Sequence, residues 1–337
     1  MGCGLMLEGK RERVVLGRVV VEVPCTCGEL VQGISEEGSF LVSCPIDVYS
    51  RVEAALTAAS EVVGPRERGK AIAAARLTLA HLGCEGVGVA LEIGNPLPAS
   101  RGFGTSTADI VGAIAATAGA LGYSLAPTEI AELAIRVEPS DSSMFPGLAL
   151  LDHRSGSRWE LLGDPPSLAI AVLDFGGAVD TVDYNAALDC RRLQEFSYLH
   201  VEALGLLRKG IANADPWAVG AAAVKSALAN QELLPKAYLV QALALARRLG
   251  GYGVCAAHSG TALGLLLPPD SATVAGALEE ARRTLPGLEA AWAARLVGGG
   301  VRVITASART SFGAGYRCQR ALLPFRWHSS SRNHGQE

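Results

Sequence analysis

The sequence predicts an α+β protein, because strand-like and helix-like segments follow one another in blocks without a regular βα alternation. Its 337 residues suit one large domain or two of ordinary size. The composition, 49% hydrophobic and 19% charged, supplies a substantial core and argues against global disorder. Asp164-Pro165-Pro166 separates the blocks, so we predict domains over 14–163 and 164–325 and a polar, disordered tail over 326–337.

Hydrophobic periodicity and turn residues place the elements within these blocks. The first block is expected to hold strand-like runs over 13–23 and within 39–56, a helix over 66–82, a strand over 87–93, and helices over 105–121 and from Pro127 to just before Pro139. The second is expected to hold a strand at 167–175, a helical region over 185–249 broken near Pro216 and Pro235, a strand–turn–strand unit over 252–269, then a helix and a last strand near 300–306.

Bulk properties exclude several classes of function. The net charge of −3 gives no overall attraction to nucleic acid or anionic membrane. The first residues lack the apolar segment of a secretory signal, and the eight cysteines contain no Cys-x-x-Cys pair, so we expect reduced thiols and a cytoplasmic protein. Ile110 to Thr128 carries no charge over 19 residues, but it is rich in alanine and contains three glycines, which favours a buried helix over a membrane span.

The segment "GFGTST", Gly102 to Thr107, opens the expected helix at 105–121. Free N–H groups at a helix start, preceded by glycines, can cradle a phosphate, although a plain hydroxyl N-cap would look the same. A dinucleotide motif is disfavoured, because Thr107 stands where its last glycine is needed. The near-Walker sequence "GPRERGKA" has Ala71 in place of the metal-binding hydroxyl, so we interpret it as a solvated helix start.

Several motifs in order give this loop a more specific meaning. "PLPASRGFGTSTADIVGA" resembles the phosphate loop of the GHMP kinases, "PCTCGELVQG" (24–33) their substrate motif, and "GVCAAHSGTALGLL" (253–266) their C-terminal glycine motif. Within that family "SCPIDVYS" (43–50), "STAD" and "EPSDS" (138–142) are most similar to the L-threonine kinases of cobalamin synthesis. The resemblance spans about residues 20–305. It implies a two-domain fold, with an N-terminal domain like domain 2 of ribosomal protein S5 and a ferredoxin-like C-terminal domain.

The resemblance also implies an enzyme that uses ATP and Mg²⁺. ATP would be bound by a set of loop residues from both parts of the chain: Pro98, Ser100, Arg101, Gly102, Phe103, Gly104, Thr105, Ser106, Thr107, Ser259, Gly260 and Thr261. The metal ligands would be Ser106, with Thr105 as the alternative, and Glu138, with Glu132 as its competitor. A hydroxyl and a carboxylate suit Mg²⁺, which keeps several waters.

The same resemblance assigns the chemistry to Glu138 and Asp141, with Asp141 either accepting the proton of the substrate hydroxyl or only orienting it. Glu29 and Asp47 are the candidates for binding a small amino-acid substrate, and His258 is expected to be structural. The expected reaction is phosphorylation of L-threonine by a monomer or homodimer. Phosphorylation of another alcohol such as L-homoserine, or nucleotide binding without catalysis, remains open. Ala262 replaces the second glycine of the C-terminal motif.

Overall fold

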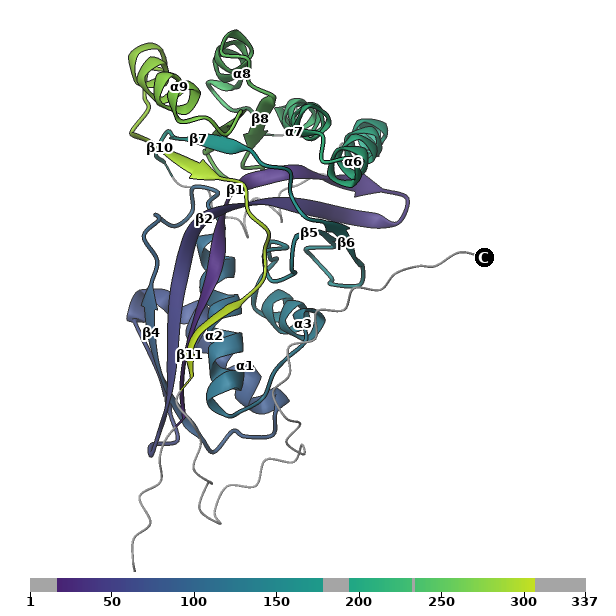
Figure 1. Ribbon diagram of the computed structural model, residues 1–337. Helices are drawn as coiled ribbons and strands as arrows, with labels where there is room; N and C mark the ends of the chain where they lie inside the picture. Colours follow the sequence, from purple (N-terminus) through teal and green to yellow (C-terminus); the bar gives the residue numbers. More distant parts are fainter. Residues whose placement is uncertain (1–16, 178–193, 232–233, 307–337) are drawn as a thin grey trace, which may run out of the picture.

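The computed structural model of the protein describes residues 17–177, 194–231 and 234–306. One mixed sheet runs through it in the order β10-β7-β9-β8-β1-β2-β4-β3 (Figure 1). β11 pairs with β1, while β5 pairs with β2 and β6. The helices form two groups, α1 to α3 in the lower half of the view and α6 to α9 at the top. This arrangement confirms the predicted α+β class.

The strands are β1 (Arg18–Ser35), β2 (Gly38–Thr57), β3 (Val62–Val63), β4 (Gly88–Gly94), β5 (Leu148–Leu151), β6 (Trp159–Gly163), β7 (Ala169–Asp174), β8 (Gly253–Ala256), β9 (Leu263–Leu267), β10 (Ala290–Arg295) and β11 (Arg302–Ala306). The helices are α1 (Gly69–His81), α2 (Thr105–Ala120), α3 (Pro127–Val137), α6 (Ser197–Ala212), α7 (Pro216–Gln231), α8 (Leu239–Arg248) and α9 (Ser271–Thr284), with a 3₁₀ turn at Arg66–Arg68. Every helix expected within the described residues is present.

The long hairpin of β1 and β2 differs from the sequence prediction. The two runs expected within 39–56 form one continuous strand, because β2 pairs with β1 along almost its whole length. The register shifts three times between Pro24 and Val31. Such bulges bend a strand and redirect its side chains. The irregular segment is the "PCTCGELVQG" motif, so the strand is distorted where a site was expected.

Helix α2 explains the uncharged stretch that begins at Ile110. It packs on β1 and β2, and most of its residues are buried. A Cβ added to Gly112 would lie 2.5 Å from Cγ2 of Val52, so glycine allows the helix to approach the sheet closely. Among the described residues, no helix is both long and apolar enough to span a membrane. The interpretation of this stretch as a core helix is confirmed.

Four strands were missed, namely β3, which is only two residues long, β5, β6 and β10. β5 and β6 are only four and five residues long, and β10 reads "AAWAAR", whose alanines favour a helix. β10 exists because it pairs with β7 along all six of its residues. The larger core cluster includes residues on both sides of the predicted boundary, such as Leu151 and Leu168, so the boundary at 164–166 stays a prediction.

The cysteine expectation holds for most of the described thiols. Cys25, Cys27, Cys44 and Cys255 are free and buried. Cys84 is disulfide-bonded, so the expectation of a reduced thiol is wrong for that residue.

Candidate active site

A cavity of about 470 Å³ opens where the first turns of α1 and α2 meet the bulged part of β1. This volume is typical of small-molecule sites. Segments that lie far apart in the sequence contribute its walls: Thr26, Glu29, Gln32, Leu41, residues 67–71, Ala99, Ser100, residues 102–107, Asp109, residues 138–141, His153 and Ser259. The cavity therefore collects the three predicted motifs in one place.

The glycine loop is held in a conformation that only glycine adopts easily. Gly102 and Gly104 have φ angles of 92° and 61°. A Cβ on Gly104 would lie 2.6 Å from Oδ2 of Asp141. The bulged strand β1 fixes the loop, since the N–H of Thr26 donates to the Phe103 carbonyl and that of Gly28 to the Gly102 carbonyl, both at 2.9 Å. Gly104 is the N-cap of α2 and has no side chain to cap the first N–H groups, which suits binding of a phosphate there.

The three hydroxyls of the loop have different surroundings. Thr105 and Thr107 are buried, with 3% and 5% exposure, whereas Ser106 is partly exposed in the cavity wall. Ser106 donates a short hydrogen bond to Oε1 of Glu138. Glu132 is exposed on α3 and does not line the cavity. Ser106 rather than Thr105, and Glu138 rather than Glu132, are therefore the pair that could hold a cation in this cavity.

Two basic residues beside this pair were missed in the sequence. Nζ of Lys70 lies 2.5 Å from Oε2 of Glu138, and the Arg68 guanidinium lies 2.8 Å from Oδ2 of Asp109. Both residues line the cavity at the start of α1. The helix start predicted for "GPRERGKA" is confirmed, but its interpretation as a merely solvated face is wrong, because this helix start forms one wall of the site.

Asp141 lies deeper, against the inner side of the loop. Its backbone N–H donates to Oγ1 of Thr107 at 3.2 Å, and its Oδ1 accepts from the Ser43 hydroxyl at 3.4 Å. Burial, together with the negative charge of Glu29, raises the pKa of Asp141 from 3.8 to about 7. A carboxyl group that titrates near neutral pH can accept a proton from a bound hydroxyl group.

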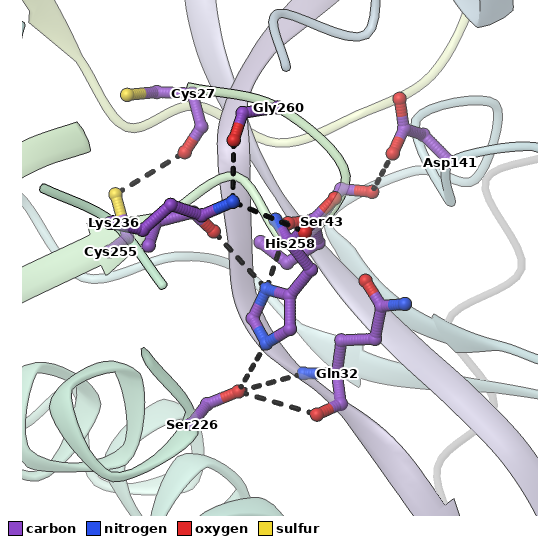
Figure 2. Close-up of polar contacts among 11 residues, drawn as sticks. Cys27, Gln32, Ser43, Asp141, Ser226, Lys236, Cys255, His258 and Gly260 are labelled. Atoms are coloured by element: carbon purple, nitrogen blue, oxygen red, sulfur yellow. Dashed lines mark hydrogen bonds and ion pairs between the residues drawn. The ribbon is translucent and has the colours of Figure 1, made fainter. Parts of the chain in front are cut away.

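Glu29 belongs to a buried polar network, part of which is drawn in Figure 2. One of its oxygens, Oε2, accepts from the backbone N–H of His258 at 2.8 Å and lies 3.1 Å from Nδ1 of the same ring. The other ring nitrogen, Nε2, lies 3.1 Å from the Ser226 hydroxyl (Figure 2). The structural role expected for His258 fits these contacts. Glu29 also lines the cavity, where its negative charge acts on Asp141.

Lys236 is a buried cation in the same network. Its ammonium donates to the carbonyls of His258 at 3.3 Å and of Gly260 at 2.5 Å (Figure 2). Burial lowers the pKa of Lys236 to about 8, although the charge of Glu29 opposes the shift. Lys236 therefore fixes the glycine turn of the C-terminal motif. No sequence pattern marked this residue.

That turn rests directly on the phosphate loop. The N–H groups of Thr261 and Ala262 both donate to the carbonyl of Arg101, at 3.1 and 3.0 Å. A Cβ on Gly260 would lie 2.5 Å from the same carbonyl oxygen. Ala262, which replaces the second glycine of the motif, is fully buried. The turn thus supports the loop through backbone contacts.

Some predicted site residues do not reach the cavity. Pro98 is exposed, and the Arg101 guanidinium binds Asp174 at 2.7 Å and Glu289 at 2.8 Å. Neither lines the cavity, and the same holds for Gly260 and Thr261, which act through the backbone. Phe103 lies in the wall but packs its ring on Trp292, with centroids 5.3 Å apart.

Asp47 is also placed elsewhere. It is exposed, it does not line the cavity, and its Oδ1 accepts the backbone N–H of Arg295 at 2.8 Å. The structure therefore corrects the expectation that Asp47 shares the substrate pocket with Glu29. Asp47 lies in β2 beside Arg295, the last residue of β10, and its hydrogen bond connects these two strands.

Comparisons with known proteins agree with this geometry. The family model described as GHMP kinases N terminal domain matches residues 69–146. This range includes the starts of α1 and α2 and the carboxylates of Glu138 and Asp141. An L-threonine kinase of Salmonella typhimurium is 34% identical over 272 residues, which cover 79% of this chain and 89% of the relative. A homoserine kinase of Moorella thermoacetica is 31% identical over 179 residues, 52% of each protein.

A solved structure shows the same fold at low sequence identity. The homoserine kinase of Cytophaga hutchinsonii superposes with a TM-score of 0.67 at 15% identity, covering 89% of this chain and all of the other. The fold likeness, the family match and the long alignment to the Salmonella relative point the same way. The chain belongs to the GHMP kinase family.

Proposed function

We propose that this protein transfers the γ-phosphoryl group of ATP to the side-chain hydroxyl of L-threonine, which yields ADP and O-phospho-L-threonine for the aminopropanol linker of cobalamin. The observation that carries the proposal is the position of Asp141. Its carboxylate lies directly beneath Gly104, so a substrate hydroxyl bound there would face phosphates held at the start of α2. The choice of L-threonine as substrate rests on the relatives named L-threonine kinase.

Each group in the cavity then has a separate task. The N–H groups at the start of α2 hold the phosphates, and Lys70 adds positive charge beside them. Ser106 and Glu138 together offer a hydroxyl and a carboxylate oxygen, a donor set that suits Mg²⁺ completed by phosphate and water. When bound, the metal neutralises phosphate charge. Asp141 orients the hydroxyl and accepts its proton as the O–P bond forms.

The test is ADP release from Mg-ATP with L-threonine, L-serine, L-homoserine, mevalonate and galactose as substrates. We expect turnover selective for L-threonine, with phosphothreonine identified by mass spectrometry. Selective turnover of L-homoserine would move the assignment to the second candidate, which the Moorella relative favours. Mg-ATP binding without turnover of any of these alcohols would contradict the proposed activity.

A further inference from the structure

His153 is the one histidine in the cavity wall, among the described residues. It lies in the turn that follows β5, and its backbone is fixed on both sides. The Asp152 carboxylate accepts the N–H groups of Arg154 at 3.2 Å and Ser155 at 3.4 Å, which organises the turn. The carbonyl of His153 accepts the N–H of Ser140 at 3.2 Å. The backbone of His153 is thus linked by one hydrogen bond to the segment that carries Asp141.

The imidazole ring of His153 is buried but has no hydrogen-bond partner. The residue is only 4% exposed, and neither Nδ1 nor Nε2 makes a hydrogen bond within the described part of the chain. Leaving a buried donor or acceptor unpaired costs about 1–3 kcal/mol, so each such group requires an explanation. His258 is a useful comparison, because it is equally buried at 3% and both of its ring nitrogens have partners.

The charge of His153 is also defined by its surroundings. Burial, together with the positive charge of Arg154, lowers its pKa to about 4. At neutral pH the ring is uncharged and offers one N–H donor and one acceptor. Glu29 lies close enough to act on it electrostatically.

The acidic groups at this end of the cavity leave one part of an amino acid without a partner, so that part must bind a neutral donor of the wall, such as the ring of His153 or the partly exposed amide of Gln32. Glu29 and Asp141 are both acids, which suit the ammonium and the hydroxyl of the substrate. Neither can bind the substrate carboxylate, which needs a hydrogen-bond donor. Lys70 and Arg68 are already paired with Glu138 and Asp109 at the other end.

We propose that His153 binds the α-carboxylate of the amino-acid substrate through a ring N–H, and so selects amino acids over simple amino alcohols. The inference rests on the proposed function and deepens it. It assigns each polar group of the substrate to a different residue: the ammonium to Glu29, the hydroxyl to Asp141 and the carboxylate to His153. The substrate carboxylate would then be the hydrogen-bond partner that the His153 ring lacks in the free protein.

The experiment compares two substrates in two proteins. L-threonine carries the carboxylate, and (R)-1-amino-2-propanol keeps the amine and the hydroxyl without it. In His153→Leu we expect kcat/KM for L-threonine to fall roughly ten- to hundredfold, as for loss of a hydrogen bond to a charged group. The rate with aminopropanol and the KM for ATP should stay the same. The ratio of kcat/KM values for the two substrates therefore collapses.

Two controls separate binding from folding. His81→Leu changes a histidine of α1 outside the cavity and should leave the ratio unchanged. His153→Leu removes an unpaired buried polar group, so its melting temperature should equal or exceed that of the wild type. An unchanged ratio, whether both substrates lose equally or neither does, would overturn the proposal. Failure of the proposed function is distinguishable, because it appears in the wild-type protein as no phosphothreonine at all.

Discussion

Both ends of the cavity contain acidic residues, but the acids of the two ends differ in whether they are paired with a basic side chain. At the phosphate end, formed by the glycine loop, Lys70 and Glu138, the carboxylate has a cation 2.5 Å away. At the inner end, formed by Glu29, Asp141 and His153, neither acid pairs with a lysine or arginine of the described chain; Glu29 contacts only the ring and backbone of His258. Glu138 and Asp141 are only three positions apart in the sequence.

This difference indicates what each end can receive. A carboxylate beside a hydroxyl group offers two oxygen ligands that can share a metal with phosphates. The acids of the inner end have no lysine or arginine partner in the described chain, so they can bind a ligand that brings positive charge or a hydroxyl group. The phosphate end therefore suits Mg-ATP, and the inner end suits an amino acid with its ammonium and hydroxyl groups.

The largest effect is expected from Asp141→Asn. The amide keeps the size and can still accept from Ser43, but it cannot accept a proton. We expect kcat to fall by roughly 10²–10⁴-fold, while Mg-ATP binding measured by calorimetry changes little. Wild-type turnover in this variant would remove Asp141 from the mechanism and, with it, the contrast between the two ends.

The raised pKa of Asp141 also predicts how pH acts. Because the ionised form is needed, kcat/KM should fall as pH drops through about 7, and this limb should be absent from any residual activity of Asp141→Asn. Stability should change in the other direction. The folded state binds this proton more tightly than the unfolded chain, so the carboxyl group costs stability that grows from about pH 4 to pH 7. Asp141→Asn should then melt higher than the wild type at pH 8, with a smaller gain at pH 5.

A smaller effect is expected at the phosphate end. Glu138→Gln keeps a carbonyl oxygen beside Ser106 but removes the charge that Lys70 and a metal share. We expect the Mg²⁺ concentration for half-maximal activity to rise roughly tenfold, because one carboxylate of a site completed by water is lost. Glu132→Gln, on the exposed face of α3, is the matched control and should behave as wild type. A larger effect of Glu132→Gln than of Glu138→Gln would reverse the assignment of the two glutamates.

The sequence predicted the parts of the molecule that depend on local pattern. Helices α1, α2 and α3 follow from their periodicity and their glycine or proline boundaries, and the loop at Gly102 to Thr107 follows from its composition. Strands β5 and β10 were missed, because only pairing with distant strands makes them strands. The same limit explains Asp47, whose place beside the end of β10 is set by its contact with the distant Arg295.

The missing site residues share one physical reason. Lys70 stands in the near-Walker sequence that we interpreted as a solvated helix start, and His153 and Lys236 belong to no motif. Each acquires its role from a partner far away in the chain or from burial. Lys70 meets Glu138 across 68 positions, and Lys236 holds the carbonyls of His258 and Gly260. His153 is notable only because its ring lies buried without a partner. Neither spacing nor composition reports contacts of this kind.

The smallest effect is expected from Asp47→Asn, which we compare with Glu29→Gln. Both residues were assigned to the substrate, but only Glu29 lines the cavity. Asp47→Asn keeps an oxygen that can accept the Arg295 N–H, so we expect kinetic constants within about twofold of wild type and stability within about 0.5 kcal/mol. Glu29→Gln should instead raise the KM for L-threonine roughly tenfold and leave the KM for ATP unchanged, because a charged partner for the ammonium is lost. Steady-state kinetics on the two variants shows which of the two residues binds the substrate. Equal effects would mean that the inner end does not recognise the ammonium through Glu29, and this would contradict the division of the cavity into two ends.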